Sequence, residues 1–146
     1  MPLYVNENDH KLENLSLRYF CSKTDIFDGV KWSQNKDSRS TWDFTGKSNE
    51  TEFQLDVKVR DINSNDYPDY FISEEKHDDS LERPCFVLYV FRGDRKMRLY
   101  DLSSCEFVKE DNQTIHHRRA NKKMTSVVYK IPSYQSVSDV LIPMKG

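Results

Sequence analysis

The sequence has few glycines, few cysteines and no long apolar run, and each shortage excludes a class of protein. Four glycines scattered over 146 residues do not form the glycine-rich loop that cradles phosphates in nucleotide-binding proteins. No run approaches the roughly 18 apolar residues of a membrane-spanning helix, and no basic segment followed by an apolar one begins the sequence. We therefore expect a cytoplasmic protein that has no membrane partner. The three cysteines include no C-x-x-C pair, which argues against a zinc site or a disulfide framework and predicts free thiols at Cys21, Cys85 and Cys105.

Apolar residues are also scarce, at 36% of the sequence against 32% charged residues. Aromatic residues, at 12%, offset this shortage because each can bury a large area. The composition therefore predicts a folded chain with a very polar surface, and the length fits a single domain over residues 1–146. The net charge of −2 does not indicate a strongly basic nucleic-acid-binding surface. A local basic groove that works with bound metal ions is still compatible with it.

Hydrophobic periodicity predicts both helices and strands. One helix is expected from about Asn8 or Asp9 to Cys21, and its apolar face would hold Leu12, Leu15, Tyr19 and Phe20. A second helix would start at the N-cap candidate Ser73 and end by Pro84. Seven consecutive apolar residues, Cys85–Phe91, predict a strand that is buried on both faces. Further strands are expected at Thr41–Thr45, Thr51–Asp61, Met97–Leu102 and Met124–Ile131, with a turn at Gly46–Asn49, a polar segment at 106–123 and an irregular tail. This order predicts an α/β (α+β) fold with a central mixed β-sheet flanked by helices.

The predicted strand Thr51–Asp61 carries the most informative pattern. Apolar and polar residues alternate along it, and side chains two apart point to the same face, so Asp56, Lys58 and Arg60 share the polar face. A carboxylate binds a hard divalent cation through oxygen. A lysine beside it can orient or deprotonate an attacking water, or stabilise charge on a phosphate. A second carboxylate is needed on a neighbouring strand, and Asp43 on the preceding strand of the predicted hairpin supplies it.

Asp43 followed by Asp56-x-Lys58 resembles the motif of the PD-(D/E)XK, or restriction-endonuclease-like, nucleases. The order of a helix, the strands that carry the motif, a second helix and a buried strand is also similar to theirs. The sequence looks similar to small uncharacterised phage and bacterial members of that superfamily. The resemblance covers roughly residues 8–102 and leads us to expect a nuclease-like core over about residues 8–131.

The resemblance implies a nuclease that hydrolyses phosphodiester bonds of DNA or RNA with Mg²⁺ or Mn²⁺. Asp43 and Asp56 would hold the metal ion, and the Val57 carbonyl would add an oxygen ligand. Lys58 would act on the attacking water or on the scissile phosphate. Glu13, in the first helix, stands where some members contribute an accessory acid. The oligomeric state is left open, a homodimer included.

Other interpretations of the same residues stay open. A D-x-K triplet on an amphipathic strand is commonly just the solvated face of a hairpin. Trp42 stands where the motif has proline, which makes the assignment of Asp43 weaker than that of Lys58. The fold could serve as a catalytically inactive binding or assembly module, or the chain could be a small interaction domain unrelated to nucleases. The basic run His116–Arg119 would either contact phosphates or form an exposed polar loop.

A rival register of the motif lies further along the chain. Pro68-Asp69, followed by Glu74-x-Lys76, also spells the motif. Glu74 and Lys76 fall at the start of the predicted second helix, where residues two apart do not share a face. We therefore reject this register in favour of Asp43 and Asp56.

Overall fold

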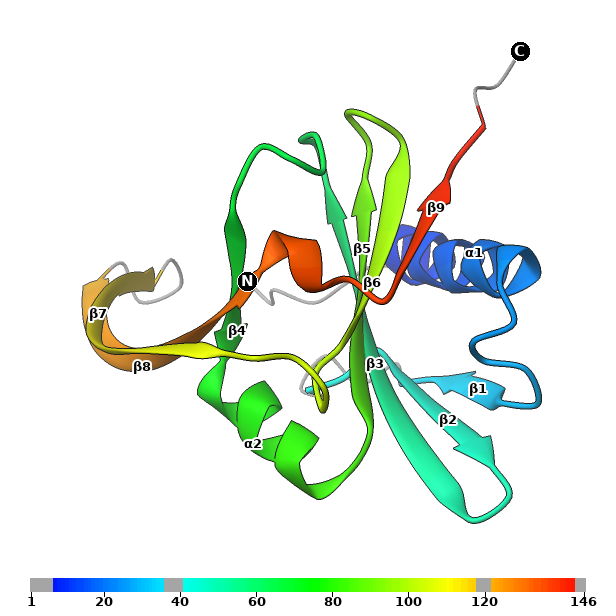
Figure 1. Cartoon of the computed structure of the whole chain (residues 1–146), viewed down its shortest axis with the longest axis horizontal. Helices are drawn as coiled ribbons and strands as arrows, with labels where there is room; N and C mark the ends of the chain where they lie inside the picture. Colours follow the sequence, from blue (N-terminus) through cyan, green and yellow to red (C-terminus); the bar gives the residue numbers. More distant parts are fainter. Residues whose placement is uncertain (1–6, 36–40, 118–121, 144–146) are drawn as a thin grey trace.

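Two β-sheets and two α-helices make up the part of the chain that the structure describes (Figure 1). This structure is a computed structural model, and it describes residues 7–35, 41–117 and 122–143. In these ranges no helix is long and apolar enough to cross a membrane. In chain order the elements are α1 (Glu7–Lys23), β1 (Lys31–Gln34), β2 (Phe44–Ser48), β3 (Thr51–Arg60), β4 (Asp69–Ser73), α2 (Glu74–Glu82), β5 (Cys85–Phe91), β6 (Lys96–Asp101), β7 (Val108–His117), β8 (Lys122–Pro132), the 3₁₀ helix η1 (Ser133–Gln135) and β9 (Ser138–Leu141).

The central sheet has six strands in the order β1-β2-β3-β5-β6-β9. Its neighbouring strands are antiparallel except β3 and β5, which run parallel because the chain crosses over through β4 and α2 between them. The strands β4, β8 and β7 form a second, antiparallel sheet. The expected α+β fold with a central mixed sheet flanked by helices is confirmed, as is the order of helix, motif strands, helix and buried strand. The second sheet was not predicted.

The strand β5 divides the core into two layers. All seven of its residues are buried, as expected, and it lies between β3 and β6. On one side Phe86, Leu88 and Val90 pack in a cluster with Leu17 and Phe20 of α1. On the other side the alternate residues of β5 pack against the second sheet, in a cluster that includes Tyr70, Ile72 and Ile131. The central sheet is therefore covered by α1 on one face and by the second sheet on the other (Figure 1).

The helix α1 buries a different face from the one predicted. It begins at Glu7, so Asn8 and Asp9 lie inside its first turn rather than at its cap. Leu15 is 64% exposed, while Leu17 and Phe20 are buried. The buried face is centred on Ser16, Leu17 and Phe20, and Leu15 lies about 200° around the helix from Leu17, so it points away from the core.

The hairpin of β2 and β3 is shifted from its predicted position. Phe44 lies opposite Leu55 and Ser48 opposite Thr51, so the turn falls after Ser48 and Asn49 adopts a φ of 56°. Gly46 is inside the strand, where a β-carbon would come within 2.6 Å of the Val30 side chain. The glycine therefore serves close packing of β1 on β2 rather than a turn, and Asp43 lies immediately before β2 instead of on it.

The C-terminal third contains more strand than the sequence predicts. The polar segment 106–123 includes β7, which pairs with β8 in a long antiparallel ribbon that extends away from the central sheet (Figure 1). His116 and His117 end β7, and the rest of the basic run lies outside the described residues. The tail was expected to be irregular, but β9 joins the central sheet through β6 and buries Val140. The three cysteines are free thiols, as predicted.

Candidate active site

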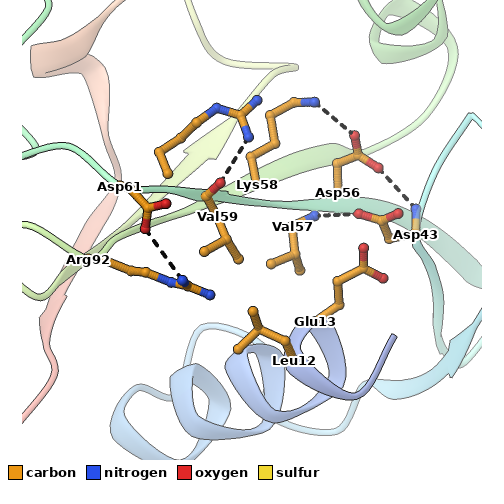
Figure 2. Close-up of a pocket in the computed structure, with 10 residues that line it drawn as sticks. Leu12, Glu13, Asp43, Asp56, Val57, Lys58, Val59, Asp61 and Arg92 are labelled. Carbon is orange, nitrogen blue, oxygen red and sulfur yellow. Dashed lines mark hydrogen bonds and ion pairs between the residues drawn. The ribbon is translucent and has the colours of Figure 1, made fainter. Parts of the chain in front are cut away.

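A pocket of about 430 Å³ lies between α1 and one edge of β3 (Figure 2). The strand β2 pairs with β3 only as far as Leu55, so in the described residues this edge of β3 has no strand partner beyond that point. Residues from distant parts of the sequence line the pocket. They include Glu13 of α1, Asp43 before β2, the β3 residues 56–60, and Arg92 after β5.

Reciprocal hydrogen bonds join Asp43 to β3. The backbone N–H of Asp43 donates to Oδ1 of Asp56 over 3.0 Å, and the backbone N–H of Val57 donates to Oδ2 of Asp43 over 2.8 Å. Continuing the β2–β3 register by one residue places Asp43 opposite Asp56. The Asp43 carboxylate thus takes the place of a strand partner at Val57. Since a residue in an antiparallel ladder exchanges its N–H and its C=O with the same neighbour, the Val57 carbonyl faces that side as well.

Burial and crowding with other acids raise the pKa of Asp43 to about 7. Burial of the carboxyl is the largest cause, and the charge of Asp56 is the second. The hydrogen bond from the Val57 N–H lowers the pKa, while the charge of Glu13 and a hydrogen bond between the Asp43 and Asp56 carboxyl groups raise it further. Two acids that crowd each other in this way form a site that a bound cation would stabilise.

Asp56 lies inside the protein rather than on a solvated strand face. It is 5% exposed, and the side chain of Lys76 from α2 contacts its carboxylate. Lys58 lies beside it, with Nζ 3.5 Å from Asp56 Oδ2. Burial lowers the pKa of Lys58, and the nearby ammonium of Lys76 lowers it further, while Asp56 opposes both effects. The expected shared face of Asp56 and Lys58 is confirmed, and the interpretation of Asp56 as a surface residue is wrong.

Lys76 contacts this site, and the sequence did not identify it. It lies in the first turn of α2, and its ammonium forms an ion pair with Oδ2 of Asp56. The same ammonium lies 5.6 Å from the centre of the Trp42 ring, within the range of a cation–π interaction. Ser73 caps α2 as predicted, since its Oγ accepts a hydrogen bond of 3.2 Å from the Lys76 backbone N–H. The rival motif register contains Lys76, but nothing in it indicates a contact with Asp56.

Glu13 enters the pocket from α1 (Figure 2). Its Oε1 accepts a hydrogen bond of 3.4 Å from Nε2 of Gln34 in β1. Its negative charge contributes to the raised pKa of Asp43. The structure therefore brings together Glu13, Asp43, Asp56, Val57 and Lys58, all the residues that the sequence nominates, and their roles stay predictions.

The donors in the pocket suit a hard cation. Among the described residues, no three histidine, cysteine or acidic side chains are grouped closely enough to hold a metal ion by themselves. Mg²⁺ commonly takes only one or two carboxylates and completes its shell with water and substrate phosphate oxygens. Asp43 and Asp56 provide two carboxylates, and their mutual repulsion is relieved by positive charge. The residues present therefore fit Mg²⁺ or Mn²⁺.

The sequence matches no protein-family model and no curated protein. Among solved structures, it is similar to a Holliday junction resolvase from the archaeal hyperthermophile Archaeoglobus fulgidus, with 12% identity and a TM-score of 0.49. The similarity covers 91% of this chain and 91% of the resolvase. At this level of similarity, the function has to be inferred from the pocket itself.

Proposed function

We propose that this protein is a metal-dependent nuclease that hydrolyses phosphodiester bonds of DNA or RNA. The observation that carries the proposal is the pocket at the edge of β3, where two crowded carboxylates, Asp43 and Asp56, lie beside the lysine Lys58. The pKa of about 7 at Asp43 supports it, because such shifts are concentrated at functional sites. The PD-(D/E)XK motif, which these three residues resemble, has the same chemistry.

Each residue of the pocket has a role in this proposal. Asp43 and Asp56 would hold Mg²⁺ or Mn²⁺, with the Val57 carbonyl and Glu13 as further oxygen ligands. When bound, such an ion supplies a Lewis acid that stabilises negative charge on the phosphate oxygens. Lys58 would orient or deprotonate the attacking water, whose oxygen bonds to phosphorus as the bond to the leaving sugar oxygen breaks. The lowered pKa of Lys58 favours a proton-accepting role, since a lysine must lose its proton to act as a base.

Cationic side chains along the same pocket would contact the nucleic-acid backbone. Arg60 and Arg92 line it together with Lys58. Arg60 donates a hydrogen bond of 3.0 Å to the Val59 carbonyl, and Arg92 lies 3.4 Å from Asp61 in an exposed ion pair. Exposed pairs of this kind are weak and exchange readily for a phosphate partner. These three cations share the pocket lining with the acids Glu13, Asp43, Asp56 and Asp61, so bound metal ions would supply the rest of the positive charge that nucleic acid needs.

The test is cleavage by the purified protein with Mn²⁺ on plasmid DNA, single-stranded DNA and RNA, with and without EDTA. We expect cleavage of at least one substrate, which EDTA and Asp43→Asn both abolish. Asp25→Asn is the matched control, because Asp25 is exposed and is not among the residues that line the pocket. Cleavage that survives Asp43→Asn would refute the site.

The alternative is a catalytically inactive nuclease-fold module that binds nucleic acid or takes part in an assembly. The ion pair of Lys76 with Asp56 favours it, because this contact already neutralises one of the two carboxylates without a metal ion. In that case the protein binds nucleic acid in a gel-shift assay but cleaves none of the substrates with Mn²⁺.

A further inference from the structure

We propose that Lys76 is an internal cation that competes with the divalent metal ion for Asp56, so that metal binding requires its ammonium to leave. The proposal rests on the proposed function, because it takes Asp43 and Asp56 as the metal-binding acids. It adds a residue from α2 that limits how strongly the site binds metal. It is carried by the contacts of Asp56 and by the surroundings of Lys76.

Both oxygens of the Asp56 carboxylate already have partners. Oδ1 accepts the hydrogen bond from the Asp43 backbone N–H, which fixes the residue before β2. Oδ2 contacts two ammonium groups, that of Lys76 and, at 3.5 Å, that of Lys58. Since Oδ1 already accepts the Asp43 amide, we take Oδ2 as the oxygen that a metal ion would approach. It would meet the Lys76 ammonium there, and adding a doubly charged ion to an oxygen that two ammonium groups already contact brings strong repulsion, most of all with the closer ammonium of Lys76.

The position of Lys76 is set by several contacts, which distinguishes it from a surface lysine that happens to reach an acid. Its side chain is 14% exposed. The ammonium also lies over the ring of Trp42, which is itself buried and donates a hydrogen bond of 2.9 Å from Nε1 to Asp79 of α2. The Ser73 cap fixes the backbone of Lys76. These contacts keep the ammonium at the carboxylate when no metal ion is present.

Release of the ammonium needs no movement of α2. The lysine side chain has four methylene groups, and rotation about them moves the charge by several ångströms. Lys58 remains at the site, so the residue assigned to the chemistry is unaffected. The release also removes the repulsion between the ammonium groups of Lys76 and Lys58, which both contact Oδ2 of Asp56. Breaking the Lys76–Asp56 ion pair costs free energy, and this cost makes the free energy of metal binding less favourable.

The experiment measures Mn²⁺ binding by isothermal titration calorimetry at about pH 8, where the Asp43 carboxyl is mostly ionised. No nucleic acid is present, so the readout is independent of cleavage. We expect Lys76→Gln to bind Mn²⁺ at least about tenfold more tightly than the wild type, and Lys76→Arg, which keeps the charge, to stay within about threefold of it. Lys47→Gln is the matched control, because Lys47 is exposed on β2 and its loss changes the net charge equally.

Equal affinities for Lys76→Gln and the wild type would overturn the inference and leave the proposed function standing. If neither protein binds Mn²⁺, the proposed function fails, and the inference fails with it.

A second measurement covers the case in which Lys76→Gln does not fold. Trp32→Phe leaves Trp42 as the single tryptophan, and its fluorescence reports the ammonium that lies over its ring. We expect Mg²⁺ to change the Trp42 emission with a saturation curve that matches the binding of Mg²⁺ to the same variant measured by calorimetry. Binding of Mg²⁺ by this variant with an unchanged Trp42 emission would show that the ammonium stays in place, and the inference would be wrong.

Discussion

The backbone amide of Asp43 donates a hydrogen bond of 3.0 Å to the carboxylate of Asp56. This contact holds two acids from different parts of the chain side by side, where the chain enters β2 and where β3 loses its partner strand. The two acids nevertheless have opposite surroundings. Asp56 is neutralised by ammonium groups, while Asp43 is crowded by other acids. Substitutions that remove their charges should therefore change stability in opposite directions.

Asp56→Asn is expected to lower the free energy of unfolding by about 2 kcal/mol, or about 4 to 8 °C in Tm. Asparagine still accepts the hydrogen bond from the Asp43 amide, but the largely buried ammonium of Lys76 loses its partner. The measurement is thermal unfolding of the wild type, both single variants and the double variant Asp56→Asn/Lys76→Gln. The double variant should lose less than the sum of the two single losses, because the second substitution removes the unpaired charge. Strictly additive losses would mean that the ion pair contributes nothing.

Asp43→Asn is expected to stabilise the metal-free protein at pH 8. In the folded state the pKa of Asp43 is about 7, above the 3.8 of an unperturbed carboxyl. As the pH rises from about 4 to 7, the unfolded chain ionises this group while the folded protein does not, so the wild type loses stability over that range and no more above it. The Asp43→Asn variant has no ionisable carboxyl at this position, so it does not lose stability over this pH range in this way. The gain should be about 2 kcal/mol at pH 8, after allowance for partial solvent exposure, and close to zero near pH 4. Urea unfolding at both pH values measures it, and an equal gain at the two values would contradict the raised pKa.

Sequence patterns predicted the elements whose structure depends only on residues of the same segment, such as one apolar strand or one helix cap. Cys85–Phe91 has no polar residue, so only a strand buried on both faces can accommodate it, and the structure has that strand. Ser73 followed by Glu74 and Glu75 marks a helix start, and α2 begins there. The shift of β2 was not predictable in this way. Gly46 looks like a turn residue in the sequence, but it is a glycine because it packs closely against Trp32 of β1 and against Val30, which precedes β1.

In the candidate site, too, contacts within one strand were predictable and contacts between distant segments were not. Asp56 and Lys58 share a strand, so the two-residue period of β-structure was enough to place them together. Asp43 required a pairing of neighbouring strands, which the hairpin made predictable within a few residues. Lys76 reaches Asp56 from a helix 20 residues away, and only the packing of α2 against the sheet creates that contact. No periodicity within either segment encodes it.

Ser73→Ala is expected to destabilise the protein by about 1 kcal/mol, or about 2 to 4 °C in Tm. The Ser73 hydroxyl accepts a hydrogen bond from the Lys76 backbone N–H, and alanine leaves that N–H without its partner in the first turn of α2. Ser73→Asp keeps an acceptor at the same position and adds a charge that favours a helix N-terminus, so it should retain the stability of the wild type. Thermal unfolding followed by circular dichroism compares the three proteins. Equal losses in both variants would show that the hydroxyl does not act as a cap.

Lys58→Ala should remove cleavage and leave the fold intact. Lys58 projects from the polar face of β3 and is partly exposed, so its loss opens no core cavity, and Asp56 keeps Lys76 as a partner. The stability change is therefore expected to stay within about 0.5 kcal/mol, as for a surface substitution. The cleavage rate should fall by a factor on the order of 10² to 10³, the effect of losing one group that acts on the transition state.

Initial rates on the best substrate with Mn²⁺, together with thermal unfolding, measure both quantities, and Lys47→Ala at an exposed position of β2 serves as control. A variant as fast as the wild type would place the activity elsewhere, because no methyl group can replace an ammonium or amine at the scissile phosphate. A variant that unfolds would make Lys58 a structural residue, because its ion pair with Asp56 would then hold the sheet together where β3 runs without β2.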